Sequence, residues 1–331
     1  MNKIKYLLLA LVALVTVSCN KQEIFERNNT LVIYLNGRDL TRSALDKDPK
    51  SVENNINTLT VGVFAADGTV KTIRDFSSVG KSVSMNVLNL SGTDKVLCAI
   101  NTTAGIFSDV TNIQDFNNKE LELGATISKD GVNLSADNLL MYGESGITQS
   151  GSSYVANVDA YHLNSKVTLN SIKTDISNKG TFTPRDIFLM NVPNKIKVSY
   201  TNPYTSYGYY FGALNTSIPN EVQKQYIGYG NINNPINQLF FYTSPNNSDK
   251  YTKLVICGMY DADGNGPIQQ KMTYYPIVVD KNLLPNKNYI LNVSVKGVGV
   301  DSPTQDLNYS NLTVTVNVKD FDSVIKNVEL D

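Results

Sequence analysis

Short apolar runs bounded by turn-forming residues recur along the whole chain, and this pattern limits the folds that it can adopt. In residues 311–318, NLTVTVNV, aliphatic side chains alternate with Asn and Thr. A period of two is typical of a β-strand with one buried face. Similar runs occur in KSVSMNVLNL (81–90), DKVLCAINT (94–102) and NYILNVSVKGVGV (288–300), without any strand–helix alternation. The pattern predicts an all-β protein built from antiparallel sheets.

Helix content is expected to be small, with few short helices. VTNIQDFNNKELEL, residues 110–123, is the one stretch that favours a helix. At 331 residues the chain is long for a single hydrophobic core, and two domains of ordinary size are the default expectation. The polar, glycine-containing stretch DISNKGTF (175–182) is typical of a domain boundary. We therefore predict two β-sandwich domains in series, residues 43–174 and 175–331.

Charge and motifs narrow the classes of function. A net charge of −1 gives no electrostatic reason to expect a nucleic-acid partner. The sequence contains no Gly-rich phosphate loop, nucleophile elbow or metal-ligand cluster. We expect a protein that is not an enzyme and that uses neither a cofactor nor a metal.

The N-terminus has the pattern of a lipoprotein signal peptide. Two lysines precede an apolar run over residues 6–17, which is too short for a spanning helix but suits a signal-peptide core. The run ends in VTVSC, with a small residue before Cys19. This arrangement resembles a bacterial lipobox, so we predict a signal peptide over residues 1–18 and lipidation at Cys19. The alternative is an ordinary secreted protein in which the cysteine is coincidental.

The first strand-like segment stands out because it combines a core composition with a terminal position. In residues 31–35, Leu31, Ile33 and Leu35 share one face, and Val32 and Tyr34 share the other. A strand that is apolar on both faces is normally a central strand. The polar segment that follows it is rich in Arg, Asp and Lys, which indicates an exposed loop.

Arginines are concentrated beside this strand. The chain has five, and three of them, Arg27, Arg38 and Arg42, lie within the first 42 residues. Both later arginines are followed by Asp, which disfavours cleavage there. An arginine-specific protease would therefore find its best substrate just after the first strand. The alternative is a chance distribution in a protein that prefers lysine.

The C-terminus ends in a second short extended segment, SVIKNVELD, residues 323–331. Val324, Val328 and Leu330 share one parity, and no turn or hairpin partner follows. Chain ends usually fray unless another element holds them. The sequence thus predicts a removable strand at the front of the chain and an unpaired strand at its end.

Four other features favour structural interpretations. DADGNGP (261–267) resembles the start of a calcium loop, but Met272 replaces the expected Glu, so we favour a hairpin turn. Cys98 and Cys257 lie in apolar runs and are expected to be buried free thiols. The single histidine, His162, is expected to be a satisfied, half-buried side chain.

A tyrosine-rich stretch over residues 199–213 has two interpretations. Exposed, it could form an adhesive or subunit-contact surface. We favour aromatic packing between domains or over a sheet edge. A platform for a glycan is a further possibility, although the absence of Trp weakens it.

Taken together, these segments resemble the fimbrillins, the lipoprotein subunits of type V pili. The resemblance is carried by the lipobox at Cys19, by NNTLVIYLNGRDLTR with the segment after it, by KVLCAINTTAG, and by the C-terminal stretch from residue 288. It extends over nearly the whole chain. A departure is Phe321, which stands where shaft subunits often have Trp.

The resemblance implies a fold and a mode of assembly. It implies tandem transthyretin-like Greek-key β-sandwich domains and a lipidated propeptide, residues 19–42, carried to the outer membrane. An extracellular arginine-specific protease would cut after Arg42, leaving Ser43 as the new N-terminus, with Arg38 as the fallback site. The strand carrying Leu31, Ile33 and Leu35 would then be displaced.

The C-terminal strand of another subunit, with Val324, Val328 and Leu330, would fill the vacated position. Partners would be other copies or related fimbrial subunits in an extracellular, adhesive fimbria on the cell surface. Alternatives are an anchor or a tip subunit of the same fimbria, or a surface glycan-binding lipoprotein.

Overall fold

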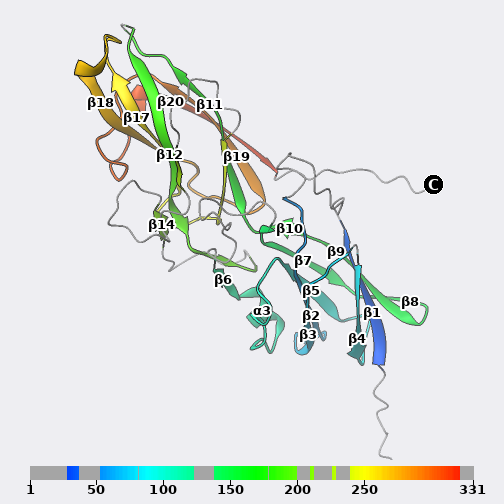
Figure 1. Ribbon diagram of the computed structural model, residues 1–331. Helices are drawn as coiled ribbons and strands as arrows, with labels where there is room; N and C mark the ends of the chain where they lie inside the picture. Colours follow the sequence, from blue (N-terminus) through cyan, green and yellow to red (C-terminus); the bar gives the residue numbers. More distant parts are fainter. Residues whose placement is uncertain are drawn as a thin grey trace, which may run out of the picture.

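The computed structural model describes residues 28–36, 53–80, 82–122, 138–177, 179–199, 209–211, 226–228 and 239–320. Within these ranges the chain is almost entirely β-strand, and its one α-helix is α3 (Ile113–Asn117) (Figure 1). The side chain of Asn112 caps α3 by accepting hydrogen bonds from the backbone N–H groups of Gln114 and Asp115. The all-β prediction and the position of the short helix are confirmed.

Two sheets face each other in the N-terminal half, and we call them the N-terminal sheet pair. The strand orders are β4-β1-β9-β8 and β10-β7-β5-β2-β3. The strands are β1 (Asn28–Asn36), β2 (Leu59–Phe64), β3 (Val70–Phe76), β4 (Ser82–Leu88), β5 (Lys95–Ile100), β7 (Met141–Gly146), β8 (Thr148–Ser150), β9 (Ser153–Asp159) and β10 (Tyr161–His162).

Two further sheets form the C-terminal sheet pair. Their orders are β16-β11-β19-β20 and β14-β12-β17-β18, with β15 also paired to β12. The strands are β11 (Ser165–Thr174), β12 (Thr181–Pro193), β14 (Tyr209–Phe211), β15 (Tyr226–Gly228), β16 (Leu239–Thr243), β17 (Lys253–Asp261), β18 (Gln270–Val278), β19 (Lys287–Val295) and β20 (Leu312–Asp320). The short 3₁₀ helices η4 (Pro267–Gln269) and η5 (Tyr309–Asn311) precede β18 and β20.

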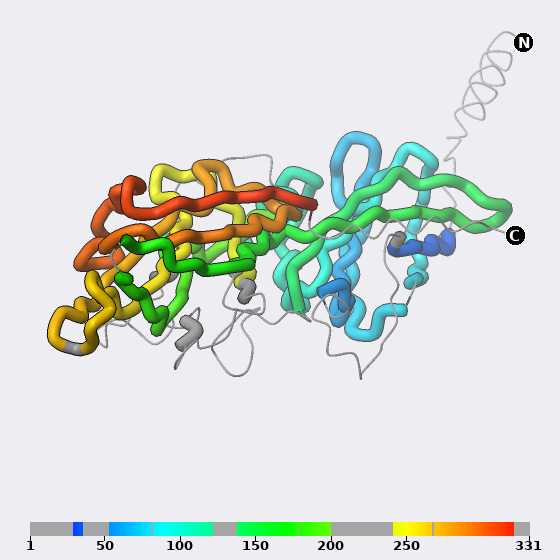
Figure 2. The backbone as a smooth tube through the Cα atoms, turned by 90° about the horizontal axis from the view of Figure 1, so that it is seen from above, coloured from blue at the N-terminus to red at the C-terminus, as the bar shows by residue number. Residues whose placement is uncertain are grey.

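The two sheet pairs lie at opposite ends of an elongated molecule (Figure 2). A small fifth sheet links them: β6 (Glu120–Glu122), from the N-terminal half, pairs with β13 (Lys195–Lys197), from the C-terminal half. One apolar cluster also contains residues from both halves, among them Phe64 and Leu291. A second cluster lies wholly within the N-terminal sheet pair.

Strand pairing differs from the sequence-based expectation in two respects. The sheets are mainly antiparallel, but each sheet pair contains one parallel contact, β1 with β9 and β11 with β19. In addition, β11 pairs with β16 and β19 of the C-terminal sheet pair, whereas the sequence had placed residues 165–174 at the end of the first domain. The sheets therefore divide between β10 and β11, and the division into two domains stays a prediction.

Candidate functional site

β1 is one of the two inner strands of its sheet and is paired along both edges. It runs antiparallel to β4, with residues 28–34 paired, and parallel to β9, with residues 31–36 paired (Figure 1). β4 has no other partner among the described strands. The central position predicted for this strand is confirmed, and the sheet continues from β4 to β9 only because β1 lies between them.

The inward face of β1 is fully part of the core. Leu31 and Ile33 have no exposed surface and Leu35 is 8% exposed, whereas Tyr34, on the opposite face, is 43% exposed. The register places buried residues side by side, since Ile33 is paired with Val83 of β4 and with Ala156 of β9. Burying three aliphatic side chains contributes roughly 5–9 kcal/mol, at 1.5–3 kcal/mol each. β1 is therefore a major stabilising element of the N-terminal sheet pair.

The two strands beside β1 cannot pair with each other directly. Neighbouring strands lie about 4.8 Å apart, so β4 and β9 are separated by about twice that distance while β1 lies between them. Without β1, both strands would present unpaired backbone N–H and C=O groups, and the apolar side chains beneath them would face water. Only another extended segment can satisfy both edges without a rearrangement of the sheet.

At the other end of the described chain, β20 is an edge strand. It pairs with β19 on one side only, in the order β11-β19-β20. The predicted alternation is confirmed: Leu312 is buried, Val314 and Val316 are half-buried, and Val318 is 49% exposed. The apolar face of β20 thus becomes more exposed toward Asp320, which forms an ion pair with Lys287.

Several predicted site residues lie outside the described ranges. These are Cys19, the cleavage positions Arg38, Arg42 and Ser43, and the C-terminal residues Phe321, Val324, Val328 and Leu330. The roles assigned to them stay predictions. The described residues beside them are Asn36, at the end of β1, Glu53, where the next described range begins, and Asp320.

The DADGNGP stretch forms the turn between β17 and β18, as predicted. Asp261 accepts hydrogen bonds from the backbone N–H groups of Asp263, Gly264 and Gly266. Burial opposes ionisation of Asp261, but these N–H groups lower the pKa of its carboxyl below the ordinary value. Gly264 and Gly266 have φ of 70° and 107°, a conformation that favours glycine. The Asp261 carboxylate thus stabilises the hairpin turn through these hydrogen bonds.

The cysteines that the structure describes are buried free thiols, as expected. Burial raises the pKa of the Cys98 thiol to about 12 and that of Cys257 to about 11. Both stay protonated near neutral pH and are therefore poor nucleophiles. His162 is fully buried, not half-buried as the sequence suggested.

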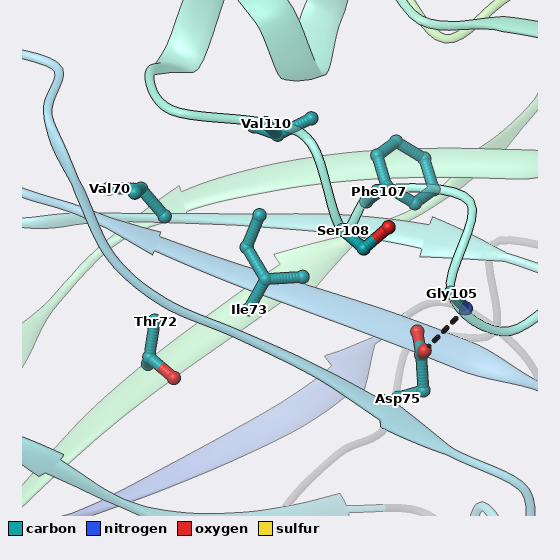
Figure 3. Close-up of a pocket in the computed structure, with 8 residues that line it drawn as sticks. All are labelled: Val70, Thr72, Ile73, Asp75, Gly105, Phe107, Ser108 and Val110. Atoms are coloured by element: carbon teal, nitrogen blue, oxygen red, sulfur yellow. Dashed lines mark hydrogen bonds between the residues drawn. The ribbon is translucent and has the colours of Figure 1, made fainter.

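A pocket of about 320 Å³ lies beside β3 (Figure 3). Its lining comes from β3 and from the loop before α3: Val70, Thr72, Ile73, Asp75, Gly105, Phe107, Ser108 and Val110. Asp75 accepts hydrogen bonds from Thr60 Oγ1 at 2.5 Å and from the backbone N–H of Gly105 at 2.7 Å. One carboxylate oxygen of Asp75 thus binds the loop at Gly105, and the other binds Thr60 on β2.

Of the tyrosine-rich stretch, the structure describes the β14 strand, Tyr209–Phe211, which pairs with β12. Apart from Ser199, the remaining residues of that stretch lie outside the described ranges, so neither interpretation of it is tested. Across the described ranges, groups of three or more His, Cys, Asp or Glu side chains suited to a metal ion are absent. No described helix has the length and apolar character needed to cross a membrane.

The fold is all-β, with the first described strand inside its sheet and the last described strand at the edge of another. Residues 30–204 match the family described as "Major fimbrial subunit protein (FimA)". The chain therefore belongs to this family of fimbrial subunits. The match begins at residue 30, within β1, and includes Leu31, Ile33 and Leu35.

Solved structures agree on the fold. A fimbrilin from Porphyromonas gingivalis superposes with a TM-score of 0.65 at 16% identity, covering 90% of this chain and 99% of that one. A protein from Bacteroides eggerthii described as a cell adhesion protein gives a TM-score of 0.66 at 18% identity, covering 89% and 96%. A similarly described protein from Parabacteroides distasonis gives 0.65 at 17% identity, covering 90% and 99%. A comparison with curated proteins produced no match.

Sequence reasoning missed one buried polar cluster. The Glu53 carboxylate lies against Lys166 and Tyr242, from the beginning of β11 and from β16. Glu53 stands in a locally polar stretch, SVENN, which by itself indicates an exposed loop. A possible signal was Lys166, a charged residue in the otherwise uncharged start of a strand-like run.

Proposed function

We propose that this protein is a shaft subunit of a cell-surface fimbria, without catalytic activity, that polymerises by protease-triggered donor-strand exchange and thereby supports adhesion. The observation that carries the proposal is the position of β1. It is an inner strand paired on both sides with a buried inward face, and among the described residues it is joined to the other strands only through the segment between Asn36 and Glu53.

The trigger follows from where the arginines stand. Arg38 and Arg42 lie in the segment that joins β1 to the rest of the fold. A cut after Arg42, with Ser43 as the new N-terminus, leaves β1 held by non-covalent contacts alone. Its release is then governed by the roughly 5–9 kcal/mol of apolar burial and by its backbone hydrogen bonds, all of which an incoming strand can replace.

The incoming strand is proposed to be the C-terminal segment of another subunit. Residues 323–331 follow β20, an edge strand whose apolar face becomes exposed toward its end. Val324, Val328 and Leu330 would lie on the face of the donor that replaces the inward face of β1. Val328 and Leu330 are two residues apart, as Ile33 and Leu35 are, and Val324 lies four residues before Val328. The donor would run parallel to β9 and antiparallel to β4, as β1 does. A head-to-tail contact of this kind does not close on itself and gives a filament.

Delivery to the surface is proposed to depend on Cys19. Lipidation there would hold the precursor at the outer membrane until an extracellular arginine-specific protease removes residues 19–42. The lipid would leave with the propeptide, so the assembled subunit would carry none. Incorporation of labelled palmitate into the parent, and its loss in Cys19→Ser, tests this step.

The main experiment uses purified precursor treated with an arginine-specific protease. The new N-terminus should be Ser43, and ladders should appear on unboiled gels. Arg42→Lys keeps the charge but removes the protease site, so it should abolish the ladders unless Arg38 is cut instead. If Arg42→Lys with Arg38→Lys still polymerises as the parent does, the proposed trigger is wrong.

Deletion of residues 323–331 removes the proposed donor strand of a subunit and leaves its acceptor position intact. The truncated subunit should fold, be cut after Arg42 and accept a strand. It cannot donate a strand to a further subunit, so a polymer should stop growing where it is incorporated. Ladders of parental length would remove the donor assignment. A parent protein that is never cut at either arginine would instead favour an anchor role.

A further inference from the structure

A buried ionic cluster joins the start of the second described segment to the C-terminal sheet pair. Glu53 is 3% exposed, and its carboxylate accepts hydrogen bonds from Lys166 Nζ and from Tyr242 Oη, both at 2.5 Å. Lys166 lies on β11 and Tyr242 on β16, paired neighbours in one sheet. Burial and the adjacent carboxylate raise the pKa of Tyr242, so its hydroxyl stays protonated and donates.

The residues just after Glu53 are fixed to the N-terminal sheet pair. Asn101 Oδ1 accepts from the backbone N–H of Asn57 at 2.8 Å. Asn101 Nδ2 donates to the carbonyl oxygens of Asn55 and Leu139, each at 2.8 Å. Asn101 is itself buried at the end of β5. Residues 53–58 are thus held at one end by the C-terminal sheet pair and at the other by the N-terminal sheet pair.

Strand pairing also relates the cluster to the end of β20. Lys166 is paired with Asn288 of β19, and Asn288 is paired with Lys319 of β20. On the other side, β9, which flanks β1, leads through β10 directly into β11 (Figure 1). Glu53 therefore contacts β11. This strand follows β9, the neighbour of β1, along the chain, and it lies in the same sheet as β20, after which the C-terminal segment begins.

We propose that Glu53 is a positioning residue that fixes residues 53–58 to the C-terminal sheet pair. It keeps the vacated β1 position and the C-terminal donor of one subunit in a constant relative placement. The first part is independent of the proposed function, and the second part rests on it. A buried carboxylate suits the task, because loss of one partner leaves the others buried without compensation.

The chain offers a matched control. Glu120 on β6 forms an ion pair with Lys195 on β13 at 3.3 Å, and this pair also joins the two halves. Both of its side chains are about one-third exposed, unlike those of Glu53 and Lys166. Exposed pairs contribute little because water screens them. Glu120→Ala therefore tests whether the loss of any Glu–Lys contact between the two halves has the effect expected for the loss of Glu53.

The experiment compares the parent with Glu53→Ala, Glu53→Gln and Glu120→Ala, each as full-length precursor before and after the arginine-specific cut. Hydrogen exchange measured by mass spectrometry reports on residues 54–58 and on β11, with β17 and β18 as the internal check of folding. In cut Glu53→Ala we expect exchange at residues 54–58 to rise at least about tenfold. Glu120→Ala should match the parent.

Glu53→Gln keeps an acceptor oxygen for both donors and covers the case in which Glu53→Ala does not fold. We expect its exchange at residues 54–58 to rise about threefold or more. Parental exchange in both Glu53 variants, or an equal rise in Glu120→Ala, overturns the proposal.

Gel ladders separate this inference from the proposed function. Cut Glu53→Ala should form shorter ladders than the parent although its N-terminus is also Ser43. If the exchange rises but the ladders match the parent, the placement of donor and acceptor does not depend on Glu53, and that part of the proposal is wrong. If the parent itself never polymerises, the function proposal fails while the exchange result still decides the role of Glu53 in joining the two halves.

Discussion

β1 and β11 hold equivalent places in two similar sheets, yet they are secured differently. Each is antiparallel to one neighbour, β4 or β16, and parallel to another, β9 or β19. Each parallel neighbour then pairs with an antiparallel edge strand, β8 or β20. The sheet position is therefore shared, and the difference must come from side chains and chain connections.

Among the described contacts, the side chains of β11 make more hydrogen bonds than those of β1, and one of the β11 bonds is a buried ion pair. Ser165 Oγ donates to the carbonyl oxygen of Leu284, Lys166 contacts Glu53, and Thr168 Oγ1 donates to Asn288. For β1 the described side-chain bond is an exposed contact from Thr30 to Asn86. Apolar burial is non-directional, so another aliphatic strand can replace β1, whereas β11 is specified by its partners.

The chain connections reinforce this contrast. β11 is continuous with β10 before it and is followed by β12 after residues 175–180. β1 is joined to β2 through residues 37–58, which contain both candidate arginines. A single cut can therefore free β1 but cannot free β11. The comparison teaches that exchangeability depends on the type of contact and on the connection, and not on depth in the core.

The largest expected effect comes from a competing peptide. A peptide of residues 28–36 added in excess to cut precursor should suppress the ladders, because it restores both backbone edges and the three buried side chains. The same peptide with Ile33→Asp should have no effect, since a buried unpaired carboxylate is strongly unfavourable. Ladders that form equally with either peptide would contradict the view that the β1 position is the acceptor.

A pair of core substitutions should distinguish the two strands by stability. Ile33→Ala and Leu169→Ala each remove a fully buried side chain, and each should lower the free energy of unfolding of the precursor by ~2–5 kcal/mol. After cleavage and assembly, only Leu169→Ala should still destabilise the subunit, because β1 is no longer present. Denaturant unfolding of precursor and polymer measures both values, with the exposed Tyr34→Ala as the control.

The smallest effect concerns the β17–β18 turn, far from either strand. The folded pKa of Asp261 is lower than its ordinary value of 3.8, so its contribution to stability is present above that value. The contribution is lost as the pH falls through the folded pKa. Denaturation midpoints of parent and Asp261→Asn should therefore converge as the pH falls from about 5 to 2. A constant difference across this range would mean that ionisation of Asp261 does not stabilise the turn.

Local patterns predicted local features well. Alternation indicated the strands, residues 110–123 were singled out as the one stretch favouring a helix, and the DADGNGP spacing indicated a turn. Cys98 and Cys257 were correctly expected to be buried because each lies in an apolar run. Each of these depends on residues close in sequence, where periodicity and turn chemistry dominate.

The amino-acid sequence by itself determined the all-β class, the apolar face of the first strand and the arginines placed after it. Only the tertiary structure decided that β1 lies between β4 and β9, that β11 belongs to the C-terminal sheet pair, and that Glu53 is buried against Lys166 and Tyr242. Alternation tells which side of a strand is buried, but not which strand is its neighbour. Neighbours are chosen by non-local pairing, so the partners of Glu53 become visible only when the sheets have formed.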